Sequence, residues 1–364
     1  YSLRSLTGGD PKVVRVRRVI DNAESDFTAS GVSSGALTSF VNDIQTVGTA
    51  VNGTGSFDNY TVSNLSTTGF SADNSAGGTG SAGFPYVFKD EDVLVIKYTV
   101  TNFSSTSSLS PAIRGVNNVN SVTGKTNAGT TFTANGTYTD TLTATADGTH
   151  LMFADGNTGS YTISDFEIVS HSSSGFVETW YDQSGNSKDA VQATAGSQPK
   201  IVNAGSFLNE LDFDGTADEL AIDFGADLSQ ANSFFMVHQS DTTTANSNDF
   251  FDRVSGSPRT LFDQSGNNYR MFSDSSADTG VAITTDKSLV FALYNGASSL
   301  FAKNGTATSA LNAGTAGVNQ NSSLGASNVS FYNGTIQEFI IYNSDQSSNR
   351  VAVETNINNQ YSIF

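Results

Sequence analysis

The sequence predicts an all-β protein built from two antiparallel β-sandwich domains, one inserted in the other, with short peripheral helices. Length is the first observation, because 364 residues exceed the roughly 250 residues at which a single hydrophobic core stops growing. Composition is the second. Only 14% of the residues are charged, and Ser, Thr, Asn and Gly suit short strands joined by many turns. Aromatic residues make up 10% of the chain, enough to fold a core rather than leave disorder.

Alternation of apolar and polar side chains is the third observation, and it marks each predicted strand. A period of two places successive side chains on opposite faces of a sheet. The stretches with this pattern are residues 13–19, 94–100, 138–144, 176–180, 233–238 and 334–342. Dipeptides that favour tight hairpins lie between them, at Asn135-Gly136, Asp147-Gly148, Asp155-Gly156, Asp214-Gly215, Asn295-Gly296, Asn304-Gly305 and Asn333-Gly334. Antiparallel sheet is the expected product.

Two short stretches have a helical pattern, residues 34–42 and residues 347–361. In the second, Val351, Ile357 and Tyr361 can share one helix face. This helix follows a strong strand, so we expect it to pack across a sheet and close the domain.

A change in composition marks the insertion. Gly, Ser, Thr and Asn dominate residues 51–170, which we predict to be an inserted sandwich domain. Residues 1–50 and 171–364 then form the discontinuous outer domain. The core candidates of the inserted domain are Phe88, Ile96, Tyr98, Leu142, Met152, Phe153, Ile163, Phe166 and Ile168.

Charge and residue usage exclude several classes of partner. The formal net charge is −18, so phosphate backbones and anionic membranes are repelled, and we expect no nucleic acid. No run of about 18 apolar residues is present, so we expect no membrane insertion. The chain has no cysteine, which excludes disulfides and thiol chemistry, and its three histidines are scattered. Its first residue is Tyr1 rather than Met, from which we expect that an upstream segment has been left out.

Several segments in order resemble one family. Residues 1–4 and 14–18, the Trp-Tyr-Asp-Gln-Ser-Gly-Asn segment at 180–186, the stretch 198–202 followed by 211–218, and the strand at 333–342 are similar to concanavalin A-like, laminin G-like domains of phage tail-fibre and virion proteins. These sandwiches are distantly similar to the catalytic domain of α-L-arabinofuranosidases. The resemblance covers about residues 1–45 and 175–364 and implies a jelly-roll sandwich. The inserted block resembles carbohydrate-binding modules by pattern only.

The segment after the predicted strand 176–180 is the candidate carbohydrate site. Trp180 and Tyr181 offer flat apolar faces for sugar rings, and Asp182, Gln183 and Asn186 can exchange hydrogen bonds with hydroxyls. The alternative is a structural corner, in which Trp180 belongs to the core and the polar side chains bond the turn backbone. A near-copy at residues 262–267 favours a reusable turn.

Clustered carboxylates suggest a tentative calcium site at Asp212, Asp214 and Asp218, because hard cations prefer oxygen ligands. The alternative is a solvated acidic turn. No cofactor is required by the sequence, and calcium is the one we consider.

A basic strand stands out in this acidic chain. Lys12, Arg15, Arg17 and Arg18 fall on one predicted strand, and Arg15 and Arg17 share a face. We expect either pairing with nearby acidic residues such as Asp21 and Glu24 or contact with an acidic neighbouring subunit.

Catalysis has little support in the sequence. Glycoside hydrolysis needs two carboxylates at a defined separation, and the candidates are Glu178, Glu338 and the pair Asp218 and Glu219. None lies in the tight Glu-x-Asp-x-x-Glu pattern of laminarinase-type sandwich hydrolases. We therefore predict that the chain is not an enzyme.

The resemblance implies a structural or adhesion protein of a virion or appendage, such as a phage fibre, spike or head-decoration component. Its expected partners are host or surface glycans and other virion or appendage subunits, in a homo-oligomer at the virion surface or in the extracellular space. The alternatives are a secreted bacterial cell-surface adhesin and a glycoside hydrolase of arabinofuranosidase-like type.

Overall fold

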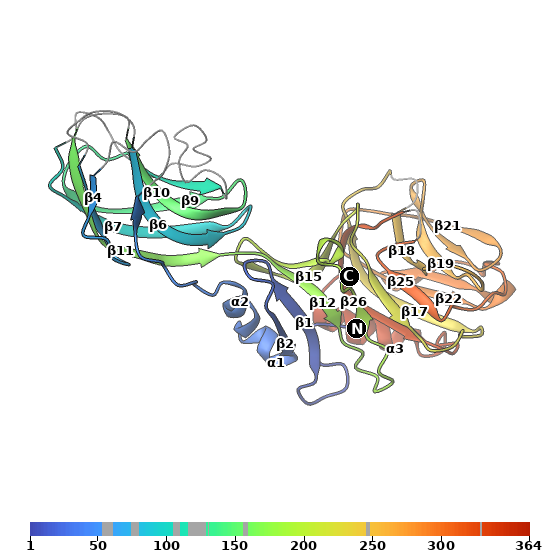
Figure 1. Cartoon of the computed structure of the whole chain (residues 1–364). Coiled ribbons are helices and arrows are strands. Elements are labelled where there is room, and N and C mark those ends of the chain that lie inside the picture. The colour runs from blue at the N-terminus through green and yellow to red at the C-terminus, as the bar shows by residue number, and fades with distance from the viewer. Residues whose placement is uncertain are drawn as a thin grey trace.

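The computed structural model describes all residues except 53–60, 74–79, 105–109, 116–128, 130, 156–158, 245–247 and 328–329. The described chain is built mainly of antiparallel strands with three short α-helices, which confirms the predicted all-β sandwich class (Figure 1). None of the helices in this described part is both long and apolar enough to cross a membrane.

One set of seventeen strands comes from the two ends of the chain. The N-terminal part contributes β1 (Lys12–Arg18) and β2 (Glu24–Thr28). The rest are β12 (Gly175–Trp180), β13 (Ala190–Val191), β14 (Lys200–Asn203), β15 (Ser206–Asp214), β16 (Leu220–Asp223), β17 (Asn232–Ser240), β18 (Asn248–Arg253), β19 (Leu261–Ser265), β20 (Asn268–Phe272), β21 (Ser276–Ala282), β22 (Ser288–Tyr294), β23 (Leu300–Lys303), β24 (Thr306–Ala307), β25 (Asn321–Leu324) and β26 (Asn333–Tyr342). Two short 3-10 turns, η1 (Ala195–Ser197) and η2 (Gly296–Ser298), interrupt the loops.

These strands branch at β12 into two arms. One arm runs through β14, β15, β26, β17, β22, β23 and β24. The other runs through β13, β16, β25, β18, β19, β20 and β21. Side chains from both arms form one hydrophobic cluster, including Leu211, Met236, Phe251, Phe262 and Phe339. The two arms are therefore the two layers of a sandwich.

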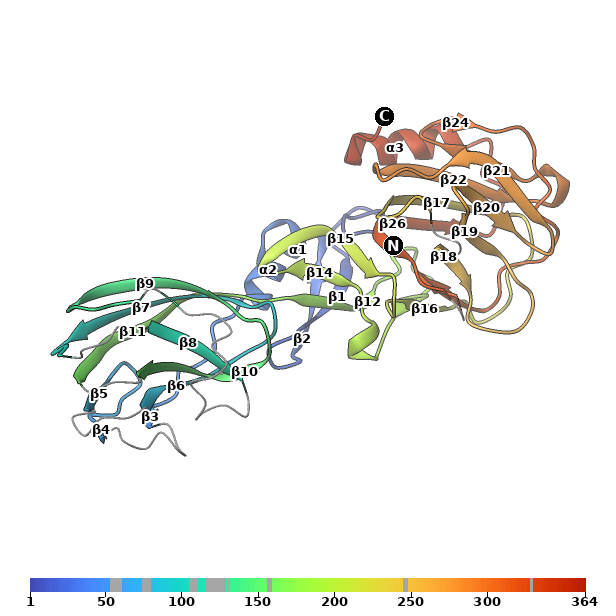
Figure 2. The same cartoon turned by 90° about the horizontal axis from the view of Figure 1, so that it is seen from above.

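The helix α3 (Arg350–Tyr361) covers the outer face of the first arm. Ile357 of α3 belongs to a second cluster with Phe235 and Val237 of β17 and Phe291 of β22. Consequently β17 and β22 are buried on both faces, and they lack the polar alternation of a half-exposed strand. Figure 2 shows α3 lying along this layer.

The middle of the chain forms two further sheets. Four strands make the first, β3 (Val51–Asn52), β6 (Gly80–Phe88), β10 (Gly148–Asp155) and β8 (Ser110–Gly115). Five make the second, β4 (Thr61–Ser63), β5 (Phe70–Asp73), β11 (Ser160–Ser172), β7 (Val93–Thr101) and β9 (Gly136–Thr143). Their shared cluster contains the core candidates named above except Met152, which is buried outside it.

Strand β7 shows how the sequence directs this packing. Leu94, Ile96, Tyr98 and Val100 are fully buried, and the residues between them are not. Because side chains alternate across a sheet, this pattern turns one face of β7 to the core and the other to solvent.

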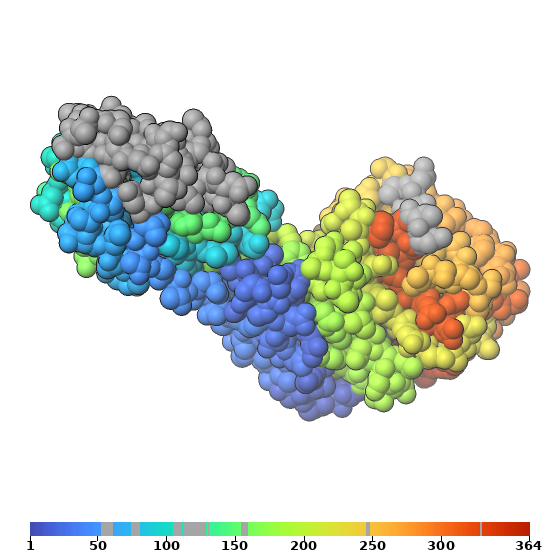
Figure 3. All heavy atoms as spheres, viewed as in Figure 1, coloured from blue at the N-terminus to red at the C-terminus, as the bar shows by residue number. Residues whose placement is uncertain are grey.

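Residues 51–172 form one lobe and the remainder of the chain forms the other, with β1 and β2 on the side of it that faces the first lobe (Figure 1 and Figure 3). The predicted boundaries at 50/51 and 170/171 stay a prediction. Strand β11 runs without a break through the predicted boundary at 170/171, and β12 begins three residues after the end of β11.

The predicted helix at 34–42 corresponds to α2 (Ala36–Val41), and a further short helix, α1 (Ala29–Ser33), precedes it. Gly35 separates them with a φ of +83°, a conformation that glycine adopts at low cost. The predicted hairpin dipeptide Asn304-Gly305 joins β23 to β24 with φ values of +49° and +78°. Two positive φ angles define a type I′ turn, which explains the Asn-Gly choice.

A buried carboxylate joins three separate elements. Glu338 of β26 has a fully buried side chain and accepts hydrogen bonds from Arg4 Nε (2.8 Å), Arg4 Nη2 (2.9 Å), Ser2 Oγ (2.9 Å) and Tyr361 Oη (3.1 Å). The N-terminal segment, β26 and α3 thus meet at one charge. The cost of burying this charge is offset only while Arg4 and the two other donors, Ser2 and Tyr361, surround it.

We expect Arg4→Met to lower the free energy of unfolding by about 3–5 kcal/mol, because it leaves the buried Glu338 carboxylate without a counter-ion. Urea denaturation measures the change. The matched control is Glu91→Gln, which removes the exposed ion pair between Lys200 and Glu91 and is expected to cost at most about 0.5 kcal/mol. Equal effects of the two substitutions would show that the Glu338 network is not a stabilising joint.

Candidate functional site

The loop after β12 is held by Asp182. Its Oδ1 accepts a hydrogen bond from Ser184 N (2.8 Å), and its Oδ2 accepts from Lys188 N (3.0 Å) and Ser184 Oγ (2.9 Å). Gly185 lies within the loop at a φ of +85°. Burial acts to raise the pKa of Asp182, but the hydrogen bonds from Ser184 and Lys188 outweigh it and hold the pKa below its ordinary value.

Gln183 fastens the same loop to the N-terminal segment. Its Nε2 donates to the carbonyl oxygens of Ser2 and Arg4, both at 3.0 Å, and its Oε1 accepts from Leu6 N at 2.8 Å. The predicted sugar contact of Gln183 is therefore replaced by a structural role.

Trp180 is fully buried, so the predicted sugar-stacking role is wrong for this residue. Its ring packs against the ring of Tyr1, with centroids 5.8 Å apart. The alternative of a core tryptophan is the one that the structure shows.

Tyr181 and Asn186 are accessible but point to different partners. The Tyr181 hydroxyl donates to Asp26 Oδ1 at 2.6 Å, and Lys12 Nζ lies 5.9 Å from the centroid of its ring. Asn186 is exposed, and its Nδ2 donates to Ser184 Oγ at 2.8 Å. Of these two, only Asn186 borders the cleft described next.

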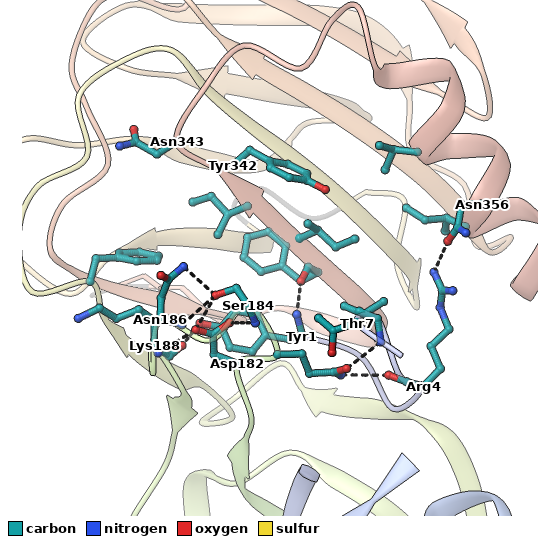
Figure 4. Close-up of a pocket in the computed structure, with 18 of the residues that line it drawn as sticks. Tyr1, Arg4, Thr7, Asp182, Ser184, Asn186, Lys188, Tyr342, Asn343 and Asn356 are labelled. Carbon is teal, nitrogen blue, oxygen red and sulfur yellow. Dashed lines mark hydrogen bonds between the residues drawn. The ribbon is translucent and has the colours of Figure 1, made fainter. Parts of the chain in front are cut away.

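A cleft of about 950 Å³, here called the main cleft, lies against this loop. Its walls are the loop with the N-terminal segment, the end of β26, and α3. Figure 4 shows Tyr342 and Asn343 on one side, facing Asp182, Ser184, Asn186 and Lys188 on the other. Its apolar lining includes Phe224, Leu228, Ile341, Tyr342 and Val353, and its polar lining includes Arg4, Asp182, Ser184, Asn186, Lys188, Asn343 and Asn356.

The side chains of Asn343 and Asn356 in the main cleft are each held by a hydrogen bond to the amide oxygen. Asn343 Oδ1 accepts from Asn232 Nδ2 at 2.9 Å, and Asn356 Oδ1 accepts from Arg4 Nη2 at 3.0 Å. Within the part of the chain that the structure describes, the Nδ2 group of each is left to donate to a ligand. Tyr342 supplies the aromatic face, and its ring is supported edge-on by Phe235 at 6.1 Å.

Sequence reasoning missed the far wall of this cleft. Tyr342 ends a predicted strand, and an exposed Asn follows it, but nothing in the sequence pairs them with residues 182–186. The available signal was an aromatic residue at a strand end next to a polar side chain.

Two of the three predicted calcium ligands, Asp214 and Asp218, accept hydrogen bonds within their own turn. Asp214 Oδ1 caps its own turn by accepting from Thr216 N (2.8 Å) and Ala217 N (2.9 Å), and Asp218 Oδ2 accepts from Asp214 N (3.1 Å). Asp212 lies on β15 before this turn. Across the described ranges, no group of three or more His, Asp or Glu side chains is arranged to hold a metal ion, these three included.

The pKa values of the carboxyls at this turn shift in opposite directions, although burial acts to raise all three. Burial raises the pKa of Asp218 to about 7, and the neighbouring Asp214 carboxylate adds to the rise. Burial also raises the pKa of Asp212. Asp214 keeps a lowered pKa because the hydrogen bonds from Thr216 and the turn backbone outweigh its burial.

Two arginines of the basic strand form ion pairs within the chain. Arg15 Nε donates to Asp26 at 2.7 Å, and Arg18 binds both Asp21 and Asp43 at 2.8 Å. Arg17 is buried and bonds neutral groups, with Nε donating to Gln198 Oε1 at 2.7 Å. Pairing with acidic neighbours is therefore what the structure shows for Arg15 and Arg18, and a subunit contact through Arg15, Arg17 and Arg18 stays a prediction.

The carboxylates considered for hydrolysis are committed to structural contacts. Glu338 is enclosed by Arg4, Ser2 and Tyr361. Glu178 accepts a hydrogen bond from Thr179 Oγ1, and Glu219 accepts one from Ser323 Oγ at 3.0 Å.

We expect Asp218→Asn to remove part of the pH dependence of stability. The folded chain holds a proton on Asp218 between about pH 4 and pH 7, whereas the unfolded chain does not, so the wild type loses stability as pH rises through this window. The asparagine variant is expected to be more stable than the wild type at pH 8, by on the order of 2–4 kcal/mol, and equally stable near pH 4. Urea denaturation across this range measures the difference.

Calcium is the control for this prediction. The described carboxylates form no cation site, so added calcium should leave the Tm of both proteins unchanged. A rise in Tm for the wild type alone would restore the calcium site at Asp212, Asp214 and Asp218.

No protein-family model matches the chain, and no curated protein matches it. The chain is similar to a structure described as truncated AlyQ with CBM32 and alginate lyase domains, at 10% sequence identity and a TM-score of 0.29. The match covers 83% of this chain and 98% of that chain.

This finding corrects one prediction. The matched polypeptide contains a lyase domain, so the prediction that the present chain is not an enzyme is not retained. A TM-score of 0.29 assigns neither a reaction nor a substrate. No phage or virion family is named by the comparisons.

Proposed function

We propose that this protein binds glycans and that the main cleft is the binding site. The observation that carries the proposal is the placement of the Tyr342 ring across the cleft from the polar loop at residues 182–188. A sugar ring has an apolar C–H face and an equatorial set of hydroxyls, and a site for it needs an aromatic face with polar groups at the sides.

Each polar group in the cleft has a definite capacity for hydrogen bonding. The Nδ2 groups of Asn343 and Asn356 donate, and the Oδ1 of Asn186 accepts. Their side chains are already held by bonds to Asn232, Arg4 and Ser184, so little side-chain freedom is lost when a ligand binds. A pre-oriented set of this kind favours a ligand with several hydroxyls.

We expect wild-type protein to bind members of a broad glycan array and Tyr342→Ala to weaken that binding by at least about tenfold, because the stacking face is lost. Asn343→Ala is expected to weaken it about threefold to tenfold, the effect of one hydrogen bond. Isothermal titration with the best array ligand measures both, and release of reducing ends in the same samples records any turnover.

The matched control is Val351→Ala, which changes an exposed residue of α3 outside the cleft and should leave affinity unchanged. Circular dichroism verifies the fold of each variant. Absence of binding by the folded wild type, or full binding by Tyr342→Ala, would refute the proposal.

We also propose that the protein is displayed on a virion or in the extracellular space as part of an appendage, in a homo-oligomer. Support comes from the order of segments that resemble laminin G-like virion domains and from a glycan-binding cleft, which is useful at a surface that meets a host. The alternative of a bacterial surface adhesin shares both features.

Antibodies raised against the folded chain should label intact virions or unpermeabilised cells, and sedimentation should give a mass of more than one chain. Labelling of virions selects the appendage, and labelling of cells selects the adhesin. Labelling that appears only after lysis, or a monomer in sedimentation, would contradict the corresponding part of the proposal.

A further inference from the structure

A second cleft, of about 610 Å³, adjoins the main cleft. It lies across the ends of β13, β16, β25 and β18, whose strands pair in that order. The residues that line it include Val191, Ala221, Asp223, Val254, Ser255 and Asn321.

The second cleft has unusual surface chemistry for this chain. Val191 is 37% exposed and Val254 is 44% exposed, and both line it. In the described part of the chain only eight large apolar side chains are this exposed, so two in one cleft form a local apolar surface. Asp223, Ser255 and Asn321 place polar groups beside them, which repeats the combination found in the main cleft.

Lys188 connects the two clefts, because it lines both. Asp223 and Phe224 are adjacent in the sequence and also join the two clefts. Asp223 lines the second cleft, and Phe224 lines the main cleft. Gly225 follows them at a φ of +77°, and a Cβ there would lie only 2.9 Å from Lys188 Nζ. The Lys188 ammonium therefore lies directly against this backbone and forms a ridge between the clefts.

The ridge itself has unused hydrogen-bonding capacity. Among the described residues, Lys188 Nζ makes neither an ion pair nor a hydrogen bond, so its three donors are available to a ligand that crosses from one cleft to the other.

We infer that the two clefts are consecutive subsites for one linear, neutral oligosaccharide that crosses the Lys188 ridge. This inference rests on the proposed function of the main cleft. A neutral ligand is favoured because Asp182, Asp189 and Asp223 line the path and the chain carries a net charge of −18. Arg4 is already paired with Glu338, which leaves Lys188 as the cation in contact with both clefts.

The test measures affinity against ligand length. Isothermal titration compares a disaccharide with successively longer oligosaccharides of the same neutral repeat, chosen from the best array ligand. We expect affinity to rise by at least about tenfold once the ligand spans both clefts and then to level off, because the second set of contacts is made within one complex.

Variants assign that gain to the second cleft. Val254→Asp and, separately, Val191→Ser should remove the gain for long oligosaccharides and leave the affinity for the disaccharide unchanged. Val351→Asp is the matched control, since it places the same charge on an exposed valine outside both clefts. Tyr342→Ala should weaken ligands of every length.

The possible results separate the inference from the proposed function. Equal affinity for the disaccharide and the long oligosaccharides, or a gain that survives Val254→Asp and Val191→Ser, overturns the two-cleft site and leaves glycan binding in place. Binding of neither ligand overturns both. Tighter binding of an oligouronate of equal length overturns the neutral ligand class.

Discussion

The buried Glu338 carboxylate is the constraint that brings the walls of the main cleft together. A charge without solvent must be surrounded by donors, and here the donors come from three elements that are far apart in the sequence. Arg4 and Ser2 bring the N-terminal segment to β26, and Tyr361 brings the end of α3. Because the N-terminal segment and α3 are also walls of the main cleft, the network that satisfies one charge joins these walls to β26.

The same helix explains why the two lobes have different strand patterns. Residues 51–172 form two sheets around one shared core, so strands such as β7 alternate buried and exposed side chains. In the other lobe, α3 covers the outer face of the layer that contains β17 and β22, and both strands are buried along nearly their whole length. The end of β26 lies across the main cleft from the loop at residues 182–188, with Tyr342 opposite Asp182.

Sequence reasoning located one side of the candidate site and missed the other. Of the predicted sugar-contact residues, Asp182, Gln183 and Asn186 border the cleft, whereas Trp180 is in the core, and Gln183 also fastens the loop to the N-terminal segment. Tyr342, Asn343 and Asn356 were not predicted, because their approach to residues 182–186 depends on β26 and α3 packing across the whole chain length. Likewise, the sequence did not show which groups the Arg15, Arg17 and Arg18 strand contacts, because Asp26, Asp43 and Gln198 come beside it only in the folded chain.

The pentapeptide Asp-Gln-Ser-Gly-Asn occurs twice, and its two copies show which features the local sequence determines and which it does not. Both copies keep a left-handed glycine, Gly185 and Gly266, which the local sequence determines because glycine has no Cβ to clash. At 182–186 the segment is an irregular loop, and Asp182 caps it, whereas Asp263 lies in β19, is fully buried and pairs with Arg270. Alternation and turn residues thus determined the all-β class and the positions of the six predicted strands by themselves. Tertiary structure decided the role of each polar side chain, because that role depends on which distant strand supplies its partner.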